Sequence, residues 1–398
     1  MTRGGVWTDV VGQDATVEIL AAAVADSAAV LRGNLSGNAG SGAMPGAGYM
    51  THAWLFTGPP GSGRSVAARA FAAALQCLNG GCGECQACHT VLGGTHADVE
   101  VLSTELLSIG VKETRELVRR AALSPAGGRW QVIIAEDADR LTDQAANALL
   151  KAIEEPPPRT VWILCAPATE DVLPTIRSRC RSVHLGTPSA AAVAEVLIRR
   201  DGVAPEDAHA AALASQGHIG RAKRLAKDPE ARSRRADVLA LPQNLHDVGS
   251  CLRAAERMVK AVQADVAATS AESDAAEVES LKAALGIGTG AKQPPGAAAA
   301  LKELEKRQKA RATRSQRDGL DRALVDLVAF YRDVLAVQVG SDVALVNAAE
   351  ARAVHAVAAA GTPEATLRRI EAILACRTAL EANAAPQLAV EAMTLALR

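Results

Sequence analysis

Residues Ala53–Ser65 read AWLFTGPPGSGRS, a short apolar run that leads into a glycine-rich turn. The apolar run predicts a buried strand over Ala53–Thr57, and the residues after the turn predict a helix over Ser65–Leu75. A glycine-rich turn between a strand and a helix is the context of a phosphate-binding loop, because its backbone N–H groups can face an anion at the helix N-terminus. The segment therefore indicates an α/β fold organised around a phosphate loop.

Strands and helices continue to alternate after this loop. Helices are predicted over Val111–Leu123 and Thr142–Glu154, and buried-type strands at Val99–Leu102, Gln131–Ala135, Val161–Cys165 and Ser182–Leu185. This alternation is typical of a parallel sheet covered by helices on both faces. On the N-terminal side of the loop, Leu31–Gly48 holds six glycines, two serines and a proline, so we expect a flexible insertion there.

From Thr187 onward the pattern is helical. Helices are predicted at Ala190–Arg199, Pro205–Ser215 and Ile219–Ala226, and a longer helical region begins near Glu230. We expect a loop or disordered linker over Thr269–Ala300, because this stretch contains Gly286, Gly288, Gly290, Pro294 and Pro295. Leu301–Arg317 carries seven basic and two acidic residues. We interpret it as a solvated helical face, with a contact to nucleic acid or a protein partner as the alternative.

The composition limits the classes of protein that the chain can be. Its 398 residues suggest two or three domains, and 49% apolar with 22% charged residues is typical of a globular protein. A formal net charge of −1 argues against bulk electrostatic binding to nucleic acid or to an anionic membrane as the main activity. The sequence contains no run of 18 apolar residues and no N-terminal signal pattern, so we expect a cytoplasmic protein without a membrane partner.

The phosphate loop departs at one position from the pattern G-x-x-x-x-G-K-S/T. Arg64 stands where the pattern has Lys, and no nearby Lys can replace it because the first Lys of the chain is Lys112. A planar guanidinium is bulkier than an ammonium, so we expect weak or absent hydrolysis even where nucleotide binds. Ser65 is placed to bind Mg²⁺. The candidate nucleotide ligands are Gly58, Pro59, Pro60, Gly61, Ser62, Gly63, Arg64 and Ser65; the alternative is a strand-to-helix turn with no ligand.

An acidic pair follows a neighbouring predicted strand. Glu136 and Asp137 come directly after QVIIA, where phosphate-loop enzymes hold the Mg²⁺ shell and orient the attacking water. Their order is the reverse of the usual Asp-then-Glu, so the second carboxylate is shorter by about 1.5 Å. Because positioning dominates phosphoryl transfer, we interpret the altered pair and loop as a relic or regulatory site. A solvated acidic turn is the alternative.

Four of the eight cysteines lie within twelve residues. Cys77, Cys82, Cys85 and Cys88 have the spacing C-x4-C-x2-C-x2-C, which matches a closed tetrahedral Zn²⁺ site made of four thiolates. An iron–sulfur cluster is the alternative, although the next Cys of a ferredoxin-type run is missing. His89 and His96 are alternative ligands that four thiolates do not require. We expect Cys165, Cys180, Cys251 and Cys376 to be ordinary buried thiols.

Several motifs occur together in the order of a known family. The loop GPPGSGRS is followed by the four-cysteine segment, by EDADRLTDQAANALLKAIEEPP at Glu136–Pro157 and by LPTIRSRC at Leu173–Cys180. GQ at Gly12–Gln13 and GHIGRAKRLA at Gly217–Ala226 fit the same pattern. The chain thus resembles the AAA+ subunits of the bacterial DNA polymerase III clamp loader over roughly residues 5–227. The cysteine spacing is shorter than the family's common C-x8-C-x2-C-x2-C.

The resemblance implies roles for individual residues. Within the family, Arg64 and the inverted acidic pair resemble the delta-prime type, whose nucleotide site is often degenerate, more than the ATP-hydrolysing gamma/tau type. Arg179 resembles the arginine finger that delta-prime presents to a neighbour's ATP site, and Arg177 is a supporting contact. The alternative for both is a solvated surface pair. Arg221 resembles the family's sensor arginine, and Thr169 resembles, loosely, its first sensor.

The resemblance also implies an organisation and a set of partners. It gives an AAA+ nucleotide-binding-type domain over residues 1–186, with the insertion at 31–48 and a zinc loop at 77–88. A three-helix lid follows over 187–228, and an all-α collar over 229–398 with a flexible linker at about 269–300. The implied partners are gamma/tau and delta subunits, the sliding clamp and primed DNA, within the nucleotidyltransferase complex of the replisome. An active gamma/tau-type motor and a zinc-stabilised scaffold are the alternative functions.

Overall fold

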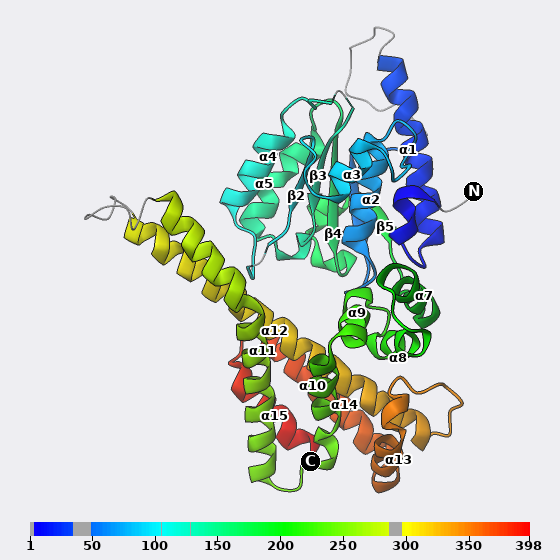
Figure 1. Cartoon of the computed structure of the whole chain (residues 1–398), viewed down its shortest axis with the longest axis vertical. Helices are drawn as coiled ribbons and strands as arrows, with labels where there is room; N and C mark the ends of the chain where they lie inside the picture. Colours follow the sequence, from blue (N-terminus) through cyan, green and yellow to red (C-terminus); the bar gives the residue numbers. More distant parts are fainter. Residues whose placement is uncertain (1–3, 35–48, 105, 128, 286–296) are drawn as a thin grey trace. The chain divides into compact units, whose positions relative to one another are not determined.

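A computed structural model of the chain describes residues 4–34, 49–104, 106–127, 129–285 and 297–398 (Figure 1). The described residues form two compact units. Unit 1 contains those up to Lys227 apart from Leu106 and Leu107, and unit 2 contains these two together with Asp228–Arg398. The predicted boundary between a sheet domain and a lid at residues 186 and 187 stays a prediction, because the contacts place both parts in unit 1.

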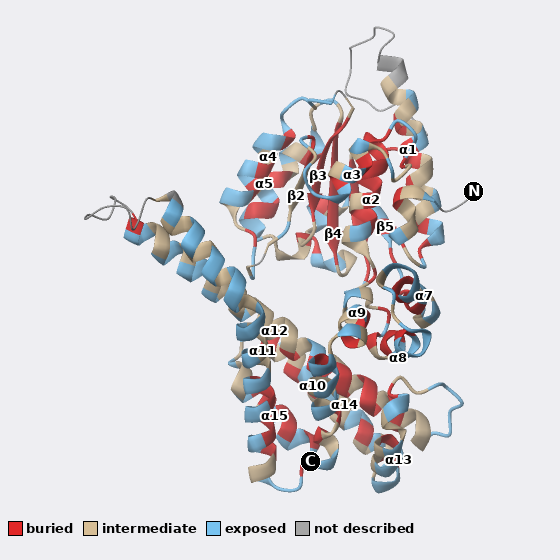
Figure 2. Cartoon of the chain, in the orientation of Figure 1, coloured by how far each residue is buried: buried red, intermediate tan, exposed pale blue. Residues whose placement is uncertain are grey.

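The core of unit 1 is a five-stranded parallel sheet with the strand order β2-β3-β4-β1-β5. Its strands are β1 (Ala53–Thr57), β2 (Val99–Leu102), β3 (Gln131–Ala135), β4 (Thr160–Ala166) and β5 (Arg181–His184). All residues of β1, β3 and β4 are buried, which explains why these strands read as continuous apolar runs rather than alternating ones (Figure 2). The predicted α/β class with a parallel sheet is confirmed.

Helices cover both faces of this sheet (Figure 1). Side chains on one face, such as Trp54 and Phe56, pack with α1 (Asp14–Asn34) and α2 (Arg64–Gln76). Side chains on the other face, such as Leu55 and Trp162, pack with α4 (Val111–Ala121) and α5 (Asp143–Glu154). The remaining helices around the sheet are α3 (Gln86–Leu92) and α6 (Pro174–Arg177).

Part of the expected insertion is helical. The first four residues of Leu31–Gly48 are the last turn of α1, because this alanine-rich helix continues to Asn34. The remainder of the predicted insertion, 35–48, lies outside the described residues.

The predicted three-helix group is present in unit 1. It consists of α7 (Ala190–Asp201), α8 (Pro205–Ser215) and α9 (Ile219–Lys227). The hydroxyl of Ser189 accepts the N–H of Ala192 and caps α7 at its start, and Gly202 ends it at φ 65°. Short 3-10 turns connect elements of both units, at Gly5–Asp9, Ala138–Arg140, Thr169–Asp171, Leu241–Gln243 and Ala348–Glu350.

The described part of unit 2 contains helices and no strands. Its helices are α10 (Pro229–Leu239), α11 (Val248–Ala284), α12 (Ala297–Gln338), α13 (Ala351–Ala360), α14 (Pro363–Glu381) and α15 (Pro386–Leu397). The core is made of aliphatic side chains, with Phe330 and Tyr331 of α12 as its buried aromatic residues. None of the helices that the structure describes is both long and apolar enough to cross a membrane.

The prediction of a loop or linker over Thr269–Ala300 was wrong at both of its ends. Residues 269–284 are the second half of α11, and residues 297–300 begin α12. Alanine and glutamate, which favour helices, outweigh the serines of the first stretch. The residues between the two helices, 286–296, include the glycines and prolines that motivated the prediction and lie outside the described residues.

Candidate nucleotide site and candidate metal centre

The phosphate loop lies between the end of β1 and the start of α2. Its three glycines, Gly58, Gly61 and Gly63, have positive φ values of 154°, 89° and 90°. A Cβ on Gly58 would lie 2.2 Å from the carbonyl oxygen of Leu185, and one on Gly61 would lie 2.6 Å from atoms of His218. The chain therefore requires glycine at these two positions for steric as well as conformational reasons.

Arg64 is the first residue of α2, and its side chain folds back onto the phosphate loop. Its guanidinium Nη1 donates a hydrogen bond to the carbonyl oxygen of Gly58. Burial lowers the pKa of Arg64, while the nearby Cys165, Asp139 and Asp137 act in the opposite direction. An arginine remains charged under such a shift, so the loop contains a fixed cation at the position where the usual pattern has Lys.

Gln13 holds the loop to the end of the sheet. Its side-chain Nε2 donates to the carbonyl oxygens of Ser62, at 3.3 Å, and Gly186, at 2.6 Å, and its Oε1 accepts from the N–H of Gly186 at 3.1 Å. The hydroxyl of Ser62 is buried and has no hydrogen-bond partner. A buried hydroxyl without a partner is costly, and an anion in the loop that accepted its hydrogen bond would remove this cost.

The acidic pair is engaged by neighbouring groups. Glu136 accepts a hydrogen bond from Nε of Arg69 at 2.9 Å, and its side chain is only 15% exposed. Asp137 accepts from the N–H of Thr104 at 3.2 Å, and Nε of Arg140 lies 3.8 Å from its carboxylate. Phosphate-loop enzymes keep such carboxylates available to the Mg²⁺ shell. As arranged here, both carboxylates already have partners in the chain, which makes them less available to a Mg²⁺ ion.

Arg179 lies on the surface after α6 and is held by its own chain. Its guanidinium contacts Oε1 of Glu154 at 2.6 Å, and its Nη1 donates to the carbonyl oxygen of Thr175 at 2.7 Å and to the hydroxyl of Ser178 at 3.2 Å. The side chain remains 40% exposed. Glu154 is the last residue of α5, so the two predicted motifs of Glu136–Pro157 and Leu173–Cys180 meet at this ion pair.

The two candidate sensor residues, Arg221 and Thr169, and the predicted supporting residue Arg177 lie on three different elements. Arg221 is half-buried in the first turn of α9, and its N–H donates to Nδ1 of His218 at 3.2 Å. Thr169 begins the 3-10 turn after β4, and Arg177 is half-buried at the end of α6. Neither Arg69 nor Glu154 is recognisable from the sequence alone, because each pairs with a residue distant in the chain.

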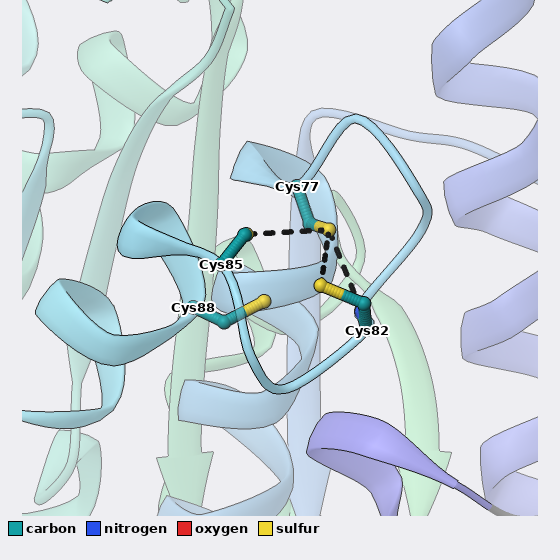
Figure 3. Close-up of side chains that lie close together, drawn as sticks. All are labelled: Cys77, Cys82, Cys85 and Cys88. Carbon is teal, nitrogen blue, oxygen red and sulfur yellow. Dashed lines mark hydrogen bonds between the residues drawn. The ribbon is translucent and has the colours of Figure 1, made fainter.

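The four predicted cysteine ligands come together in unit 1 (Figure 3). Their sulfur atoms all lie within 4.8 Å of one another, with Sγ of Cys77 at 3.6 Å from that of Cys82 and 3.7 Å from that of Cys85. A tetrahedral Zn²⁺ ion with Zn–S bonds of about 2.3 Å places its sulfur ligands about 3.8 Å apart. The cluster therefore fits such an ion, and it includes neither His89 nor His96.

The loop around Cys77 favours a thiolate. The N–H groups of Asn79 and Cys82 donate to its sulfur at 3.3 and 3.4 Å. Burial raises the pKa of Cys77, but these backbone hydrogen bonds outweigh it and bring the pKa to about 6. Burial and the neighbouring thiols of Cys85 and Cys77 raise the pKa of Cys88. One sulfur is thus prepared as a ligand, and a bound cation would deprotonate the others.

Residues 44–189 match the profile of the family described as DNA polymerase III, delta subunit. The resemblance to DNA polymerase III clamp-loader subunits is confirmed over this part of the chain. The sequence is 40% identical over 138 residues to subunit gamma/tau of Mycobacterium tuberculosis, covering 33% of this chain and 24% of that protein. It is 39% identical over 172 residues to subunit delta' of Pseudomonas aeruginosa, covering 42% and 52% of the two chains. With subunit delta' of Bacillus subtilis it shares 31% identity over 200 residues, 50% and 60% of the chains.

These matches cover only part of each protein. The chain spans between 24% and 60% of the length of these relatives. Among solved structures, a RuvB variant of Thermotoga maritima has 19% identity and a TM-score of 0.36, over 58% of this chain and 63% of that one.

Proposed function

We propose that this chain is a delta-prime-type subunit of the bacterial DNA polymerase III clamp loader. In this role it joins gamma/tau and delta subunits in a ring that places a sliding clamp on primed DNA. Its own contribution is the guanidinium of Arg179, offered to the ATP site of a neighbouring subunit. The surface position of Arg179, the arginine of the SRC motif, where Glu154 braces it, is the single observation that carries this proposal.

The nucleotide site of the chain itself supports a non-catalytic role. Arg64 lies on Gly58 inside the phosphate loop, and Arg69 pairs with Glu136. Hydrolysis requires a carboxylate or another polar group free to organise the metal shell and the attacking water. Because Arg64 occupies the phosphate loop and Arg69 engages Glu136, we expect slow or absent turnover of ATP by this chain.

An arginine finger works by electrostatics. A guanidinium fixed beside the transferred phosphoryl group stabilises the charge that develops in the transition state, and in other phosphoryl-transfer systems it is worth about 10³–10⁵ in rate. The finger must be solvent-accessible before assembly and must point in a defined direction. Arg179 meets both conditions, because it is 40% exposed and bonded to three groups of its own chain.

We assign a structural Zn²⁺ to Cys77, Cys82, Cys85 and Cys88. Four thiolates complete a tetrahedral shell and leave no open position for substrate, so a bound zinc would supply rigidity rather than chemistry. The cysteine loop packs against the N-terminal segment, where the N–H of Val6 donates to the carbonyl oxygen of Gly81 at 3.1 Å. The ion would therefore fix the segment between α2 and α3 and the chain start that lies on it.

A second candidate function is an active gamma/tau-type motor, which is favoured by the 40% identity to a gamma/tau subunit. ATP turnover by the purified chain in the presence of Mg²⁺ separates the two. The delta-prime proposal predicts turnover below the ordinary enzyme range of about one per second or faster. Turnover within that range, abolished by Arg64→Ala, would support the motor. Turnover that persists at wild-type rate in Arg64→Ala would point to a contaminating ATPase.

A further inference from the structure

We propose that the phosphate loop binds the polyphosphate chain of a nucleotide without Mg²⁺, with Arg64 as its cation and Arg69 in place of the metal at Glu136. The inference rests on the proposed function only in taking Gly58–Ser65 as a nucleotide loop. It does not depend on the role of Arg179.

The loop offers several groups to an anion. The hydroxyl of Ser62, which is 3% exposed, is buried in the loop without a hydrogen-bond partner, close to Gly58. The start of α2 contributes backbone N–H groups and its partial positive charge. Arg64 is bonded to a neutral acceptor, the carbonyl oxygen of Gly58. Exchanging that acceptor for a phosphate oxygen gives the guanidinium a partner of opposite charge in place of a neutral one, which strengthens the interaction.

The same site is unsuited to a divalent cation. Mg²⁺ prefers carboxylate oxygens and water in octahedral geometry. Glu136 already gives a carboxylate oxygen to Arg69 at 2.9 Å, and Asp137 accepts the N–H of Thr104 at 3.2 Å. A metal ion bound at that oxygen would have to displace Arg69, and a metal ion at this pair would also be repelled by Arg64, which lies within electrostatic reach of Asp137. In this site Arg64 and Arg69, rather than a metal ion, would neutralise the negative charge of a phosphate chain.

The proposal is tested by titrating the full chain with ATP, and separately with pyrophosphate, in a calorimeter with excess MgCl₂ or with excess EDTA. We expect both anions to bind, with dissociation constants that agree within about threefold between the two conditions. Arg64→Ala is expected to weaken binding at least about tenfold in both, because it removes the charge that meets the phosphate.

Arg69→Met tests the second half of the proposal while keeping the apolar stem of the side chain. Once Glu136 is released, added Mg²⁺ is expected to tighten ATP binding by about tenfold or more. Arg120→Met is the matched control, since Arg120 also pairs with a carboxylate of this unit, Glu100, at 2.6 Å. It is expected to behave as wild type.

Two results on the wild-type chain would overturn the proposal. One is that neither ATP nor pyrophosphate binds. The other is that Mg²⁺ tightens ATP binding tenfold or more. Either result leaves the finger role of Arg179 standing, because that role is measured on a partner's ATPase rather than on this loop.

Discussion

Glu154 and Arg179 lie 25 positions apart in the sequence and meet at 2.6 Å on the surface of unit 1. An exposed ion pair of this kind adds little to stability, because solvent screens it. The ion pair instead sets the direction in which the Arg179 side chain points, because a carboxylate bonded to the guanidinium restricts the rotamers of this long side chain. Glu154 is therefore a positioning residue for the proposed finger.

Glu154→Gln is expected to lower the ATPase rate of a reconstituted clamp loader about three- to tenfold, since a misdirected guanidinium stabilises the transition state less well. The KM for ATP is expected to stay unchanged, because the substitution does not touch the partner's binding pocket. Steady-state kinetics of the complex measure both quantities. Glu155→Gln, at the next position, is the control and is expected to leave the rate unaltered. A rise in KM with unchanged kcat would refute the positioning role.

At the scale of single residues, the sequence predicted which residue types occupy the site better than which side chains contact one another. The substitution of Lys by Arg64, the inverted order of Glu136 and Asp137, and the four cysteines are all visible in the sequence itself. The bond from Arg69 to Glu136 joins residues 67 positions apart on α2 and after β3. Such a pair depends on how helix and sheet pack, which one sequence does not specify.

Among the elements, the outer parts of α11 and α12 form a helical hairpin within unit 2, which we define as residues 266–284 and 297–317. Most of its surface is exposed (Figure 2). The large buried side chains of the bundle core, such as Val259 and Leu320, lie outside these segments. Polar contacts hold the two helices together instead: Arg311 pairs with Asp274 at 2.5 Å and with Glu277 at 2.8 Å.

The hairpin is expected to loosen in acid. The hydrogen bond from Arg311, with that from Gln308, lowers the pKa of Glu277 to about 2. A carboxyl group whose pKa is lower in the folded chain than in the unfolded one, about 4.3, stabilises the fold above that unfolded value. This stabilisation is lost as pH falls toward the folded pKa. Because Glu277 is partly exposed, solvent screening keeps the effect small.

Amide hydrogen exchange measures this prediction directly. In Glu277→Gln at neutral pH, amides of residues 266–284 are expected to exchange about two- to fivefold faster than in wild type. Lowering the pH from about 5 to about 2 is expected to abolish the difference between the two chains. Glu279→Gln serves as control, since Glu279 bonds Lys282 of its own helix. Equal exchange in Glu277→Gln and wild type at neutral pH would show that the pair does not hold the hairpin.

Strand and helix positions were largely predictable from the sequence. The bounds predicted for the first three strands coincide with β1, β2 and β3, because buried strands of a parallel sheet are continuous apolar runs set between turns. The error over residues 269–284 has a different origin. A polar helix without an apolar face lacks the periodic signal that identifies helices, so the loop predicted from the glycines and prolines at 286–295 was extended too far toward the N-terminus.

At the scale of the whole molecule, the sequence resemblance covered unit 1 and offered no motif for unit 2. Unit 1 carries the phosphate loop, the cysteine cluster and Arg179, whose motifs have fixed spacings. Unit 2 is aliphatic helices packed on one another, and many sequences satisfy that packing. Its composition therefore predicted an all-α region and gave no information on partners.

All four tryptophans, Trp7, Trp54, Trp130 and Trp162, lie in unit 1, so tryptophan fluorescence reports on the unit that contains the cysteine cluster. We expect one zinc per chain by elemental analysis. A strong chelator is expected to lower the fluorescence-detected Tm by several degrees, since a structural zinc contributes directly to folding. Cys82→Ser is expected to have the same effect without chelator, whereas Cys376→Ser, in unit 2, retains zinc. An iron–sulfur absorbance, or a Tm that is insensitive to chelation, would refute the zinc assignment.

The most direct test of the proposed function measures the ATPase rate of gamma/tau subunits in the presence of clamp and primed DNA. The gamma/tau subunits are assembled with delta and with either the wild-type chain or Arg179→Ala. We predict that Arg179→Ala assembles normally, shown by gel filtration, and lowers the partner's kcat by at least about a hundredfold at its site. Arg177→Ala, two residues earlier, is predicted to have a smaller effect. An unchanged kcat in a complete Arg179→Ala complex would contradict the account.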